Sequence, residues 1–230
     1  MNGVLLIPCV GPMQSWGTRS RFQERDTERE PSKSGVIGML CAALGRDRSE
    51  PVDDLSSLTM AVRVDREGKL EKDFQTAQDV AVASGGTTQN LLSNRYYLAD
   101  AAFLVGLEGP IEQLEKLHNA LEYPVWSMFL GRKSYVPSKP FYLRDGLLRG
   151  VSLNAALSAY PLLVRSNNVK IRLVCETEEV THEVRNDQPK YFALGRREFG
   201  QRYVCTSYEG ISRFPAPKEE GDDVPFTVES

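Results

Sequence analysis

The stretch that decides the fold reads Val4-Leu5-Leu6-Ile7-Pro8-Cys9-Val10, followed at once by Gly11-Pro12-Met13-Gln14-Ser15-Trp16-Gly17. A short apolar run that ends at Gly-Pro predicts a buried strand followed by a turn. Trp16 could stack on a nucleic-acid base, and Gln14 and Ser15 could bind a base edge or a phosphate oxygen. The alternative is that Trp16 only closes the end of the core, since tryptophan is usually well buried.

A helix is predicted next, beginning at Pro31 and Ser32 and ending at Gly45. Its first turn carries Lys33 and Ser34. Free N–H groups and the helix dipole make a helix N-terminus suitable for binding phosphate, so both residues are candidate RNA contacts.

The connection from residue 19 to residue 30 alternates four arginines with four acidic residues. Such a run is usually a solvated loop. Because it lies between the tryptophan stretch and the helix, Arg19 and Arg21 are candidate phosphate contacts.

Strands are predicted at 58–65, 96–107 and 125–130, and a second helix with apolar residues at helical spacing at 111–121. The order strand, helix, strand, strand, helix, strand predicts an α+β fold with a ferredoxin-like domain over residues 1–150, the arrangement that RNA-recognition modules use.

Residues 66–98 lack apolar periodicity although clear strands flank them. A long structureless loop is uncommon inside a compact domain. We therefore predict an arm built as a hairpin, with legs at 73–77 and 94–98, and we include Arg95 among the candidate RNA contacts.

Between Trp126 and Arg149 lie five basic residues, one acid and several aromatic rings. Basic groups interleaved with stacking faces suit single-stranded nucleic acid. The alternative is a basic loop whose aromatic rings point inward. The candidate RNA contacts here are Arg132, Lys133, Ser134 and Tyr135.

The rest of the chain is predicted to form a small β-rich subdomain over 151–217, with strands near 169–175 and 202–207, and an acidic, disordered tail over 218–230. That tail explains why the net charge is −3 although the other regions are close to neutral.

Composition excludes some classes of protein. The four cysteines form no C-x-x-C pair and are expected to be core residues, so no metal and no cofactor is predicted. No apolar run is long enough to span a bilayer, which predicts a cytoplasmic protein with no membrane partner. The two histidines, His118 and His182, lie in no catalytic motif, which predicts a protein that is not an enzyme.

Several of these motifs, in this order, resemble the Cas-five family of CRISPR-associated proteins (RAMP superfamily) in its type I-E branch. They are Gly-Pro-Met-Gln-x-Trp-Gly at 11–17, a Ser-Gly pair opening the helix at 34–35, and Leu-Gly-Arg-Lys-x-x-x-Pro at 130–137. The resemblance covers most of the first 145 residues.

The resemblance implies a non-catalytic subunit of the type I-E Cascade surveillance complex that binds crRNA and caps its 5′ handle. Its implied partners are the Cascade backbone subunit and large subunit, with target DNA bound in the assembled complex. The arm would act as a thumb beside the adjacent backbone subunit. Two alternatives stay open. One is a metal-independent endoribonuclease that cuts repeat RNA, as type I-C relatives do, with Lys133 and Tyr135 as a nominal pair. The other is a binder of a small ligand.

Overall fold

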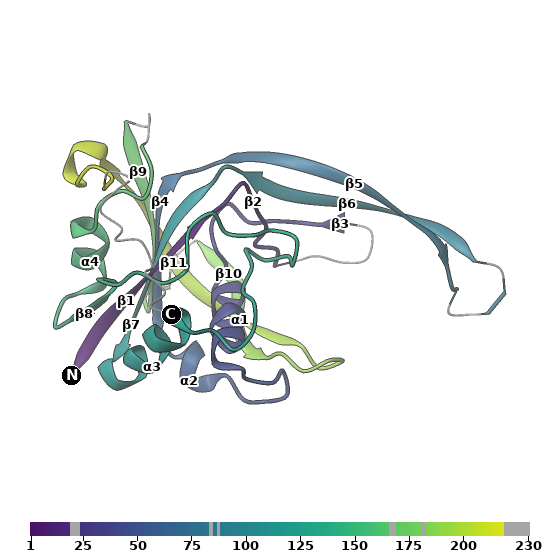
Figure 1. Ribbon diagram of the computed structural model, residues 1–230, viewed down its shortest axis with the longest axis horizontal. Coiled ribbons are helices and arrows are strands. Elements are labelled where there is room, and N and C mark those ends of the chain that lie inside the picture. Colours follow the sequence, from purple (N-terminus) through teal and green to yellow (C-terminus); the bar gives the residue numbers. More distant parts are fainter. Residues whose placement is uncertain (19–23, 83–84, 87, 166–168, 181–182, 219–230) are drawn as a thin grey trace, which may run out of the picture.

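The computed structural model describes residues 1–18, 24–82, 85–86, 88–165, 169–180 and 183–218, which fold into an α+β body with one projecting arm (Figure 1). The main sheet of the body has the strand order β10-β11-β9-β4-β7-β1-β8, and every pairing in it is antiparallel. Its strands are β1 (Asn2–Val10), β4 (Thr59–Arg66), β7 (Ala102–Pro110), β8 (Leu147–Arg149), β9 (Lys170–Thr177), β10 (Val184–Tyr191) and β11 (Glu198–Gly210).

A second, smaller sheet contains β2 (Met13–Gln14), β3 (Glu24–Arg25), β5 (Lys69–Val80) and β6 (Gln89–Ala99), and it forms the arm and its base. The helical segments are α1 (Lys33–Leu44), α2 (Asp53–Ser56), α3 (Ile111–Glu122), α4 (Leu153–Ala159) and the 3-10 turn η1 (Ile211–Arg213). Among the described residues, none of the helices has the length and apolar character needed to cross a membrane.

Strand β1 is buried on both faces, as its continuous apolar sequence predicts. Leu5 and Ile7 belong to the core under α1 and α3, while Val4 and Leu6 belong to the core under α4. In the chain, α1 connects β1 to β4, and α3 lies between β7 and β8. The two strands that flank β1 in the sheet, β7 and β8, therefore both follow α1 in the chain.

Helix α1 begins and ends where its cap residues predict. The Ser32 side chain accepts a hydrogen bond from the Gly35 N–H at 3.3 Å, and Gly45 ends α1 in the left-handed conformation, with φ of 70°. Helix α3 buries Ile111, Leu114, Leu117 and Leu121 along one face.

The prediction of a strand at 125–130 is wrong. The backbone N–H groups of Val125 and Trp126 donate to the carbonyl oxygens of Ala43 and Ala42, at 2.9 and 3.1 Å, so this run caps the C-terminal end of α1. It pairs with no strand in the part of the chain that the structure describes. The edge beside β1 is taken by β8. The strand predicted at 96–107 is in fact two strands, because Asp100 turns the chain with φ of 55° between β6 and β7.

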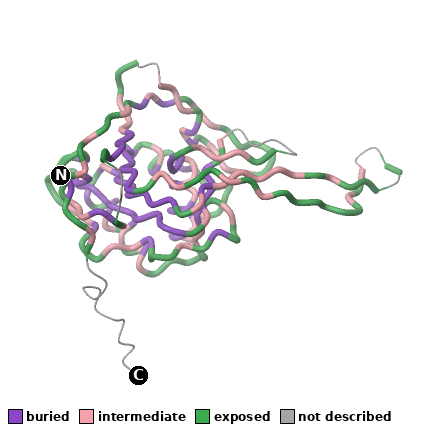
Figure 2. The backbone as a smooth tube through the Cα atoms, turned by 90° about the horizontal axis from the view of Figure 1, so that it is seen from above, coloured by how far each residue is buried: buried purple, intermediate pink, exposed green. Residues whose placement is uncertain are grey.

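The arm is a two-stranded antiparallel hairpin. The predicted legs 73–77 and 94–98 lie within β5 and β6, but residues 73–77 pair with residues 91–95. Asp73 lies opposite Arg95 and Ala77 opposite Leu91. The arm extends away from the buried core and is exposed or half-buried along most of its length (Figure 2).

The C-terminal strands extend the main sheet: β9 pairs with β4, and β11 pairs with both β9 and β10. The division of the chain at residue 150 stays a prediction, and the tail from 219 to 230 lies outside the described residues. The cysteines are only partly core residues. Cys9 and Cys41 are buried, whereas Cys175 is half-buried and Cys205 is exposed, because Cys205 lies on the face of β11 opposite to buried Val204.

Candidate nucleic-acid interface

The tryptophan stretch is built into the protein interior. Gln14 Nε2 donates to the carbonyl oxygens of Cys9 and Ala101, at 3.0 and 2.8 Å, and Gln14 Oε1 accepts from Trp16 Nε1 at 3.2 Å. Trp16 is 1% exposed. A Cβ on Gly35 would lie 2.9 Å from its ring, so glycine lets α1 approach the indole. In this conformation Gln14 and Trp16 therefore serve the core, as the alternative interpretation expects.

Ser15 joins the tryptophan stretch to the basic loop at 130–137. Its N–H donates to the Leu130 carbonyl oxygen at 3.1 Å, and its hydroxyl lies 3.3 Å from the carbonyl oxygens of both Asp26 and Tyr96. Gly131 has φ of 90°, and a Cβ there would lie 1.7 Å from the Ser15 carbonyl oxygen. The structure thus brings the two predicted loops together through their backbones.

The N-terminus of α1 is already occupied by protein groups. The Lys33 N–H donates to Asp187 Oδ2 at 2.7 Å, and Lys33 Nζ lies 2.8 Å from Glu176 Oε1. Burial lowers the pKa of Lys33, and Glu176 offsets part of that shift. The structure gives Lys33 a structural role in place of the phosphate contact that the sequence suggests, and it leaves Ser34 half-buried in the first turn.

The Arg132 guanidinium fastens the basic loop to the base of the arm. Its Nη1 donates to the Tyr135 hydroxyl at 2.8 Å, and its Nη2 donates to the carbonyl oxygens of Tyr96 and Arg25, at 3.0 and 3.3 Å. The group also lies 5.3 Å from the centroid of the Tyr135 ring, a cation–π distance. Tyr135 is itself buried. Both side chains therefore hold the loop in position.

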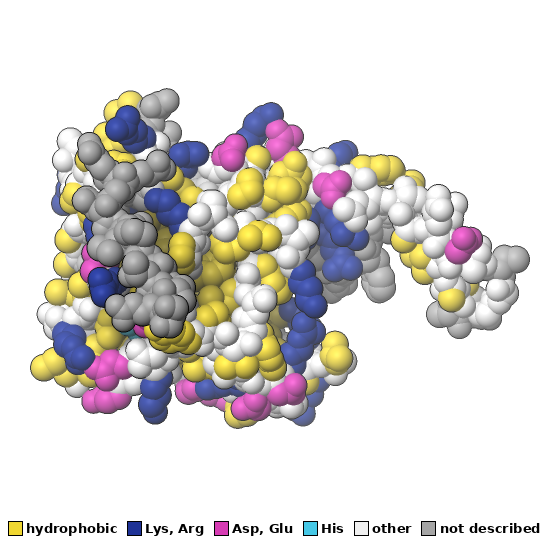
Figure 3. All heavy atoms as spheres, in the orientation of Figure 1, with side chains coloured by type: hydrophobic (Ala, Val, Ile, Leu, Met, Phe, Trp, Pro, Cys, Tyr) yellow, Lys and Arg dark blue, Asp and Glu magenta, His cyan; other side chains and the backbone are white. Residues whose placement is uncertain are grey.

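Basic side chains gather where the arm leaves the body. We call Arg25, Arg95, Arg132 and Lys133 the arm-base patch: Arg25 lies beside Arg95 in the β3–β6 pairing, and Arg132 bonds to the Arg25 backbone. Arg25 and Lys133 are exposed, and Arg95 and Arg132 are half-buried. Figure 3 shows Lys and Arg side chains along the edge of the body beneath the arm. The exposed faces of this patch can bind phosphate groups.

Sequence reasoning missed Arg25, because its place depends on a two-residue strand that pairs with a distant one. Ser134, beside Lys133, is exposed as well. The predicted contacts Arg19 and Arg21 lie outside the described residues. Among the C-terminal arginines, Arg202 is buried against Asp187, whereas Arg196 and Arg197 lie over the rings of Tyr191 and Phe199.

The groups that could support RNA cleavage do not come together in the described part of the chain. Burial raises the pKa of Tyr135, and its hydroxyl is bonded to Arg132. His118 Nε2 lies 2.9 Å from the Leu143 carbonyl oxygen on the α3 side of the body. His182 is outside the described residues. Within the described ranges, no group of three His, Cys, Asp or Glu residues could hold a metal ion.

Comparison with known proteins matches this architecture to one family. The family model described as CRISPR-associated protein (Cas_Cas5) matches residues 4–205. The CRISPR system Cascade subunit CasD of Escherichia coli (strain K12) is 30% identical over 159 residues, which cover 62% of this chain and 71% of that protein.

Two solved structures agree over nearly the whole chain. A Cas protein is 46% identical with a TM-score of 0.76, covering 93% of this chain and 98% of its own. A chain of a CRISPR RNA-guided surveillance complex is 34% identical with a TM-score of 0.76, covering 93% and 94%. With more than half of its length matched by the family model, the chain belongs to the Cas5 family of CRISPR-associated proteins.

Proposed function

We propose that this protein is a non-catalytic crRNA-binding subunit of a Cascade surveillance complex and that it caps the 5′ handle of the guide. The observation that carries the proposal is the likeness of 93% of the chain, at 34% identity, to a chain of an RNA-guided surveillance complex. In such assemblies base pairing reads the target DNA, while protein holds the RNA backbone and shape.

We assign the centre of the body to the ferredoxin-like arrangement. The strand order β4-β7-β1-β8, with α1 and α3 in the two crossovers, supports this assignment. In that arrangement the arm is an insertion between the second and third strands of the domain, β4 and β7.

The arm-base patch is the proposed site for the handle. Arg132 fixes the loop, so that Lys133 and Ser134 are presented to solvent on a rigid support. Arg25 and Arg95 add positive charge beside them. Arg19, Arg21 and Ser34 are proposed as further contacts. The buried Tyr135 hydroxyl supports binding without cleavage, because a phenol with a raised pKa is a poor general base near neutral pH.

Replacing Lys133 tests the RNA site with little risk to the fold. Lys133→Ala should weaken binding of labelled handle RNA and reduce the slope of log affinity against log salt by up to about one, as expected for the loss of one phosphate contact. Lys116→Ala is the matched control, since Lys116 is an exposed lysine on α3.

An unchanged slope for Lys133→Ala would show that the loop faces a protein partner. Labelled repeat RNA incubated with the protein in EDTA tests the remaining alternative: binding without cleavage supports the cap, and cleavage would identify a nuclease.

The arm carries an apolar face that the chain itself leaves open. Cross-strand register places Leu70, Phe74 and Leu92 on one face, and their exposed fractions are 60%, 58% and 52%. Glu71 and Asp73 lie on the opposite face. We propose that the apolar face packs on the adjacent backbone subunit, with the large subunit and target DNA joining in the assembled complex.

Removing the arm should separate assembly from RNA capture. Replacing residues 76–92 with a short Gly-Ser turn keeps the β5–β6 pairs beside Arg95. It should therefore leave the melting temperature and handle affinity nearly unchanged and strongly impair entry into the full complex, measured by size exclusion. The double variant Phe74→Ser, Leu92→Ser should impair assembly, whereas Glu71→Ser, Gln75→Ser on the other face should not. Normal assembly of the deletion would contradict the thumb assignment.

A further inference from the structure

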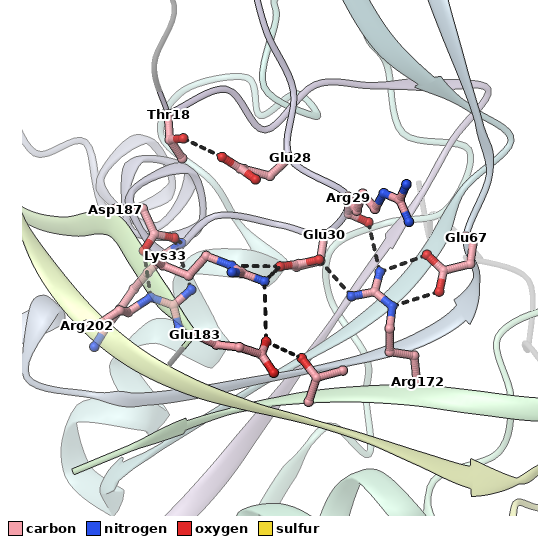
Figure 4. A network of polar contacts seen from close by, with 12 residues as sticks. Thr18, Glu28, Arg29, Glu30, Lys33, Glu67, Arg172, Glu183, Asp187 and Arg202 are labelled. Carbon is pink, nitrogen blue, oxygen red and sulfur yellow. Dashed lines mark hydrogen bonds and ion pairs between the residues drawn. The ribbon is translucent and has the colours of Figure 1, made fainter. Parts of the chain in front are cut away.

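A buried carboxylate joins the connection before α1 to the C-terminal strands (Figure 4). Glu30 is 4% exposed, with Oε2 2.8 Å from Arg172 Nη1 and Oε1 3.0 Å from Arg185 Nη2. Arg172 also donates to both carboxylate oxygens of Glu67, at 2.7 and 2.8 Å, and to the Arg29 carbonyl oxygen at 3.3 Å. We call Glu30, Glu67, Arg172 and Arg185 the Glu30 clamp.

The clamp is fully paired. Burial alone would lower the pKa of Arg172, but the hydrogen bonds to Glu67 and Glu30 outweigh it and raise that pKa. Three residues later, the Lys33 N–H and ammonium are held by Asp187 and Glu176, and Asp187 is in turn held by Arg202 at 2.7 Å. Strands β9 and β10 thus send charged groups to residues 30–33, and Arg202 on β11 holds one of those groups, Asp187. Buried ions held in this way resist displacement, because moving one leaves another unpaired.

The connection that ends at Glu30 is also fixed at its beginning. Thr18 Oγ1 donates to Glu28 Oε1 at 2.6 Å, the Glu28 N–H donates to the Trp16 carbonyl oxygen at 3.2 Å, and the Trp16 N–H donates to Thr27 Oγ1 at 2.9 Å. Between these two ends lies β3, which places Arg25 in the arm-base patch.

We infer that Glu30 is a positioning residue for guide binding: the Glu30 clamp fixes the path of residues 24–30 and thereby holds Arg25 at the RNA site. The inference rests on the proposed function. Charge gives the test of this inference a clear sign, because removing a carboxylate makes the protein more positive and by itself favours RNA at long range. Loss of positioning would act in the opposite direction.

Glu30→Gln in the full chain tests this role. The amide keeps the shape, and Arg172 keeps its bond to Glu67. Removing a negative charge should by itself strengthen RNA binding, whereas loss of positioning should weaken it. If the competent conformation falls to about one tenth of the population, the apparent Kd for handle RNA rises about tenfold. The salt slope should stay unchanged, because the bound state keeps all its phosphate contacts.

The matched control is Glu198→Gln, which removes the same charge from the exposed Lys190–Glu198 pair on β10 and β11 and should not weaken binding. Arg185→Lys is a second, charge-neutral variant in case Glu30→Gln folds poorly. This variant loses the pair of hydrogen bonds that Arg185 Nε and Nη2 donate to Glu30 Oε1. It should also raise the apparent Kd for handle RNA, by a smaller factor than Glu30→Gln does.

Hydrogen exchange of the free protein gives a readout that does not involve RNA. The backbone amides of residues 15–18 and 24–30 should exchange faster in Glu30→Gln than in the wild-type protein. In Glu198→Gln their exchange rates should equal those of the wild type. Wild-type exchange together with wild-type or tighter RNA binding would overturn the inference. If the wild-type protein itself shows no salt-dependent RNA affinity, the proposed function fails, and faster exchange would still show that the clamp fixes this connection.

Discussion

The segments 11–17 and 130–137 look alike in sequence, yet the structure uses them in opposite ways. Each combines a glycine, an aromatic ring and polar side chains. In the first, Gln14 and Trp16 bond to each other and are buried. In the second, Arg132 and Tyr135 bond to each other, while Lys133 and Ser134 are exposed. A glycine beside an aromatic ring thus indicates close packing first, and only side chains left outside that packing are free to bind RNA.

The largest effect that separates the two segments should come from Trp16. Trp16→Ala should lower the free energy of unfolding by about 3–5 kcal/mol, because it removes a large, fully packed side chain. Denaturant unfolding measures this, and RNA affinity per folded molecule should change little. The control is Trp126→Ala, at a tryptophan that is 48% exposed, where the loss should be smaller. Normal stability with RNA binding weakened by about 1–3 kcal/mol would instead make Trp16 a stacking platform.

A smaller effect should come from Gly131, where the two segments touch. Gly131→Ala adds a Cβ in a left-handed conformation and against the Ser15 carbonyl oxygen, so we expect a loss of stability of about 2–4 kcal/mol. Gly195→Ala has a similar φ of 78° with no atom within 4 Å of the added Cβ. It should therefore lose only about 1–2 kcal/mol. Equal losses in thermal unfolding would mean that the contact between the two segments relaxes freely.

The smallest of these effects should come from Arg132. Arg132→Ala should lower stability by about 1–3 kcal/mol, because the Tyr135 hydroxyl and two backbone carbonyl oxygens lose their donor. Tyr135→Phe removes only one of these bonds and should lose about 0.5–1.5 kcal/mol. Unchanged stability of Arg132→Ala together with a reduced salt slope for RNA binding would show that Arg132 binds phosphate directly, as Lys133 is proposed to do.

Local signals predicted much of the fold. The apolar run of β1, the caps of α1 and the spacing of apolar residues in α3 each depend on neighbours in sequence, and each lies where it was expected. The strand predicted at 125–130 is absent because the backbone N–H groups of this run bond to the C-terminal carbonyl oxygens of α1, and hydrophobicity does not reveal such a partner. The joining of β9 to β4 was missed for a related reason, since edge pairing between distant strands leaves no periodic signal.

The candidate site was less predictable than the fold. Lys33 looked like a phosphate ligand at a helix N-terminus, but Glu176 and Asp187 reach it from strands far along the chain. Arg25 looked like any residue of a solvated loop, until β3 placed it beside Arg95. Sequence shows which residue types could bind RNA, whereas long-range partners decide which of them stay exposed.

The ion pairs around α1 also impose an order on the making of the protein. Lys33 and Glu176 are 143 residues apart, so at about 5–20 residues per second the ribosome adds Glu176 roughly 7–30 seconds after Lys33. Until Glu176 has been added, the Lys33 ammonium lacks the carboxylate that pairs with it in the folded protein. The first helix of the chain can therefore reach its final place only after strands β9 and β10 have been synthesised, which makes its docking a late step in the folding of the chain.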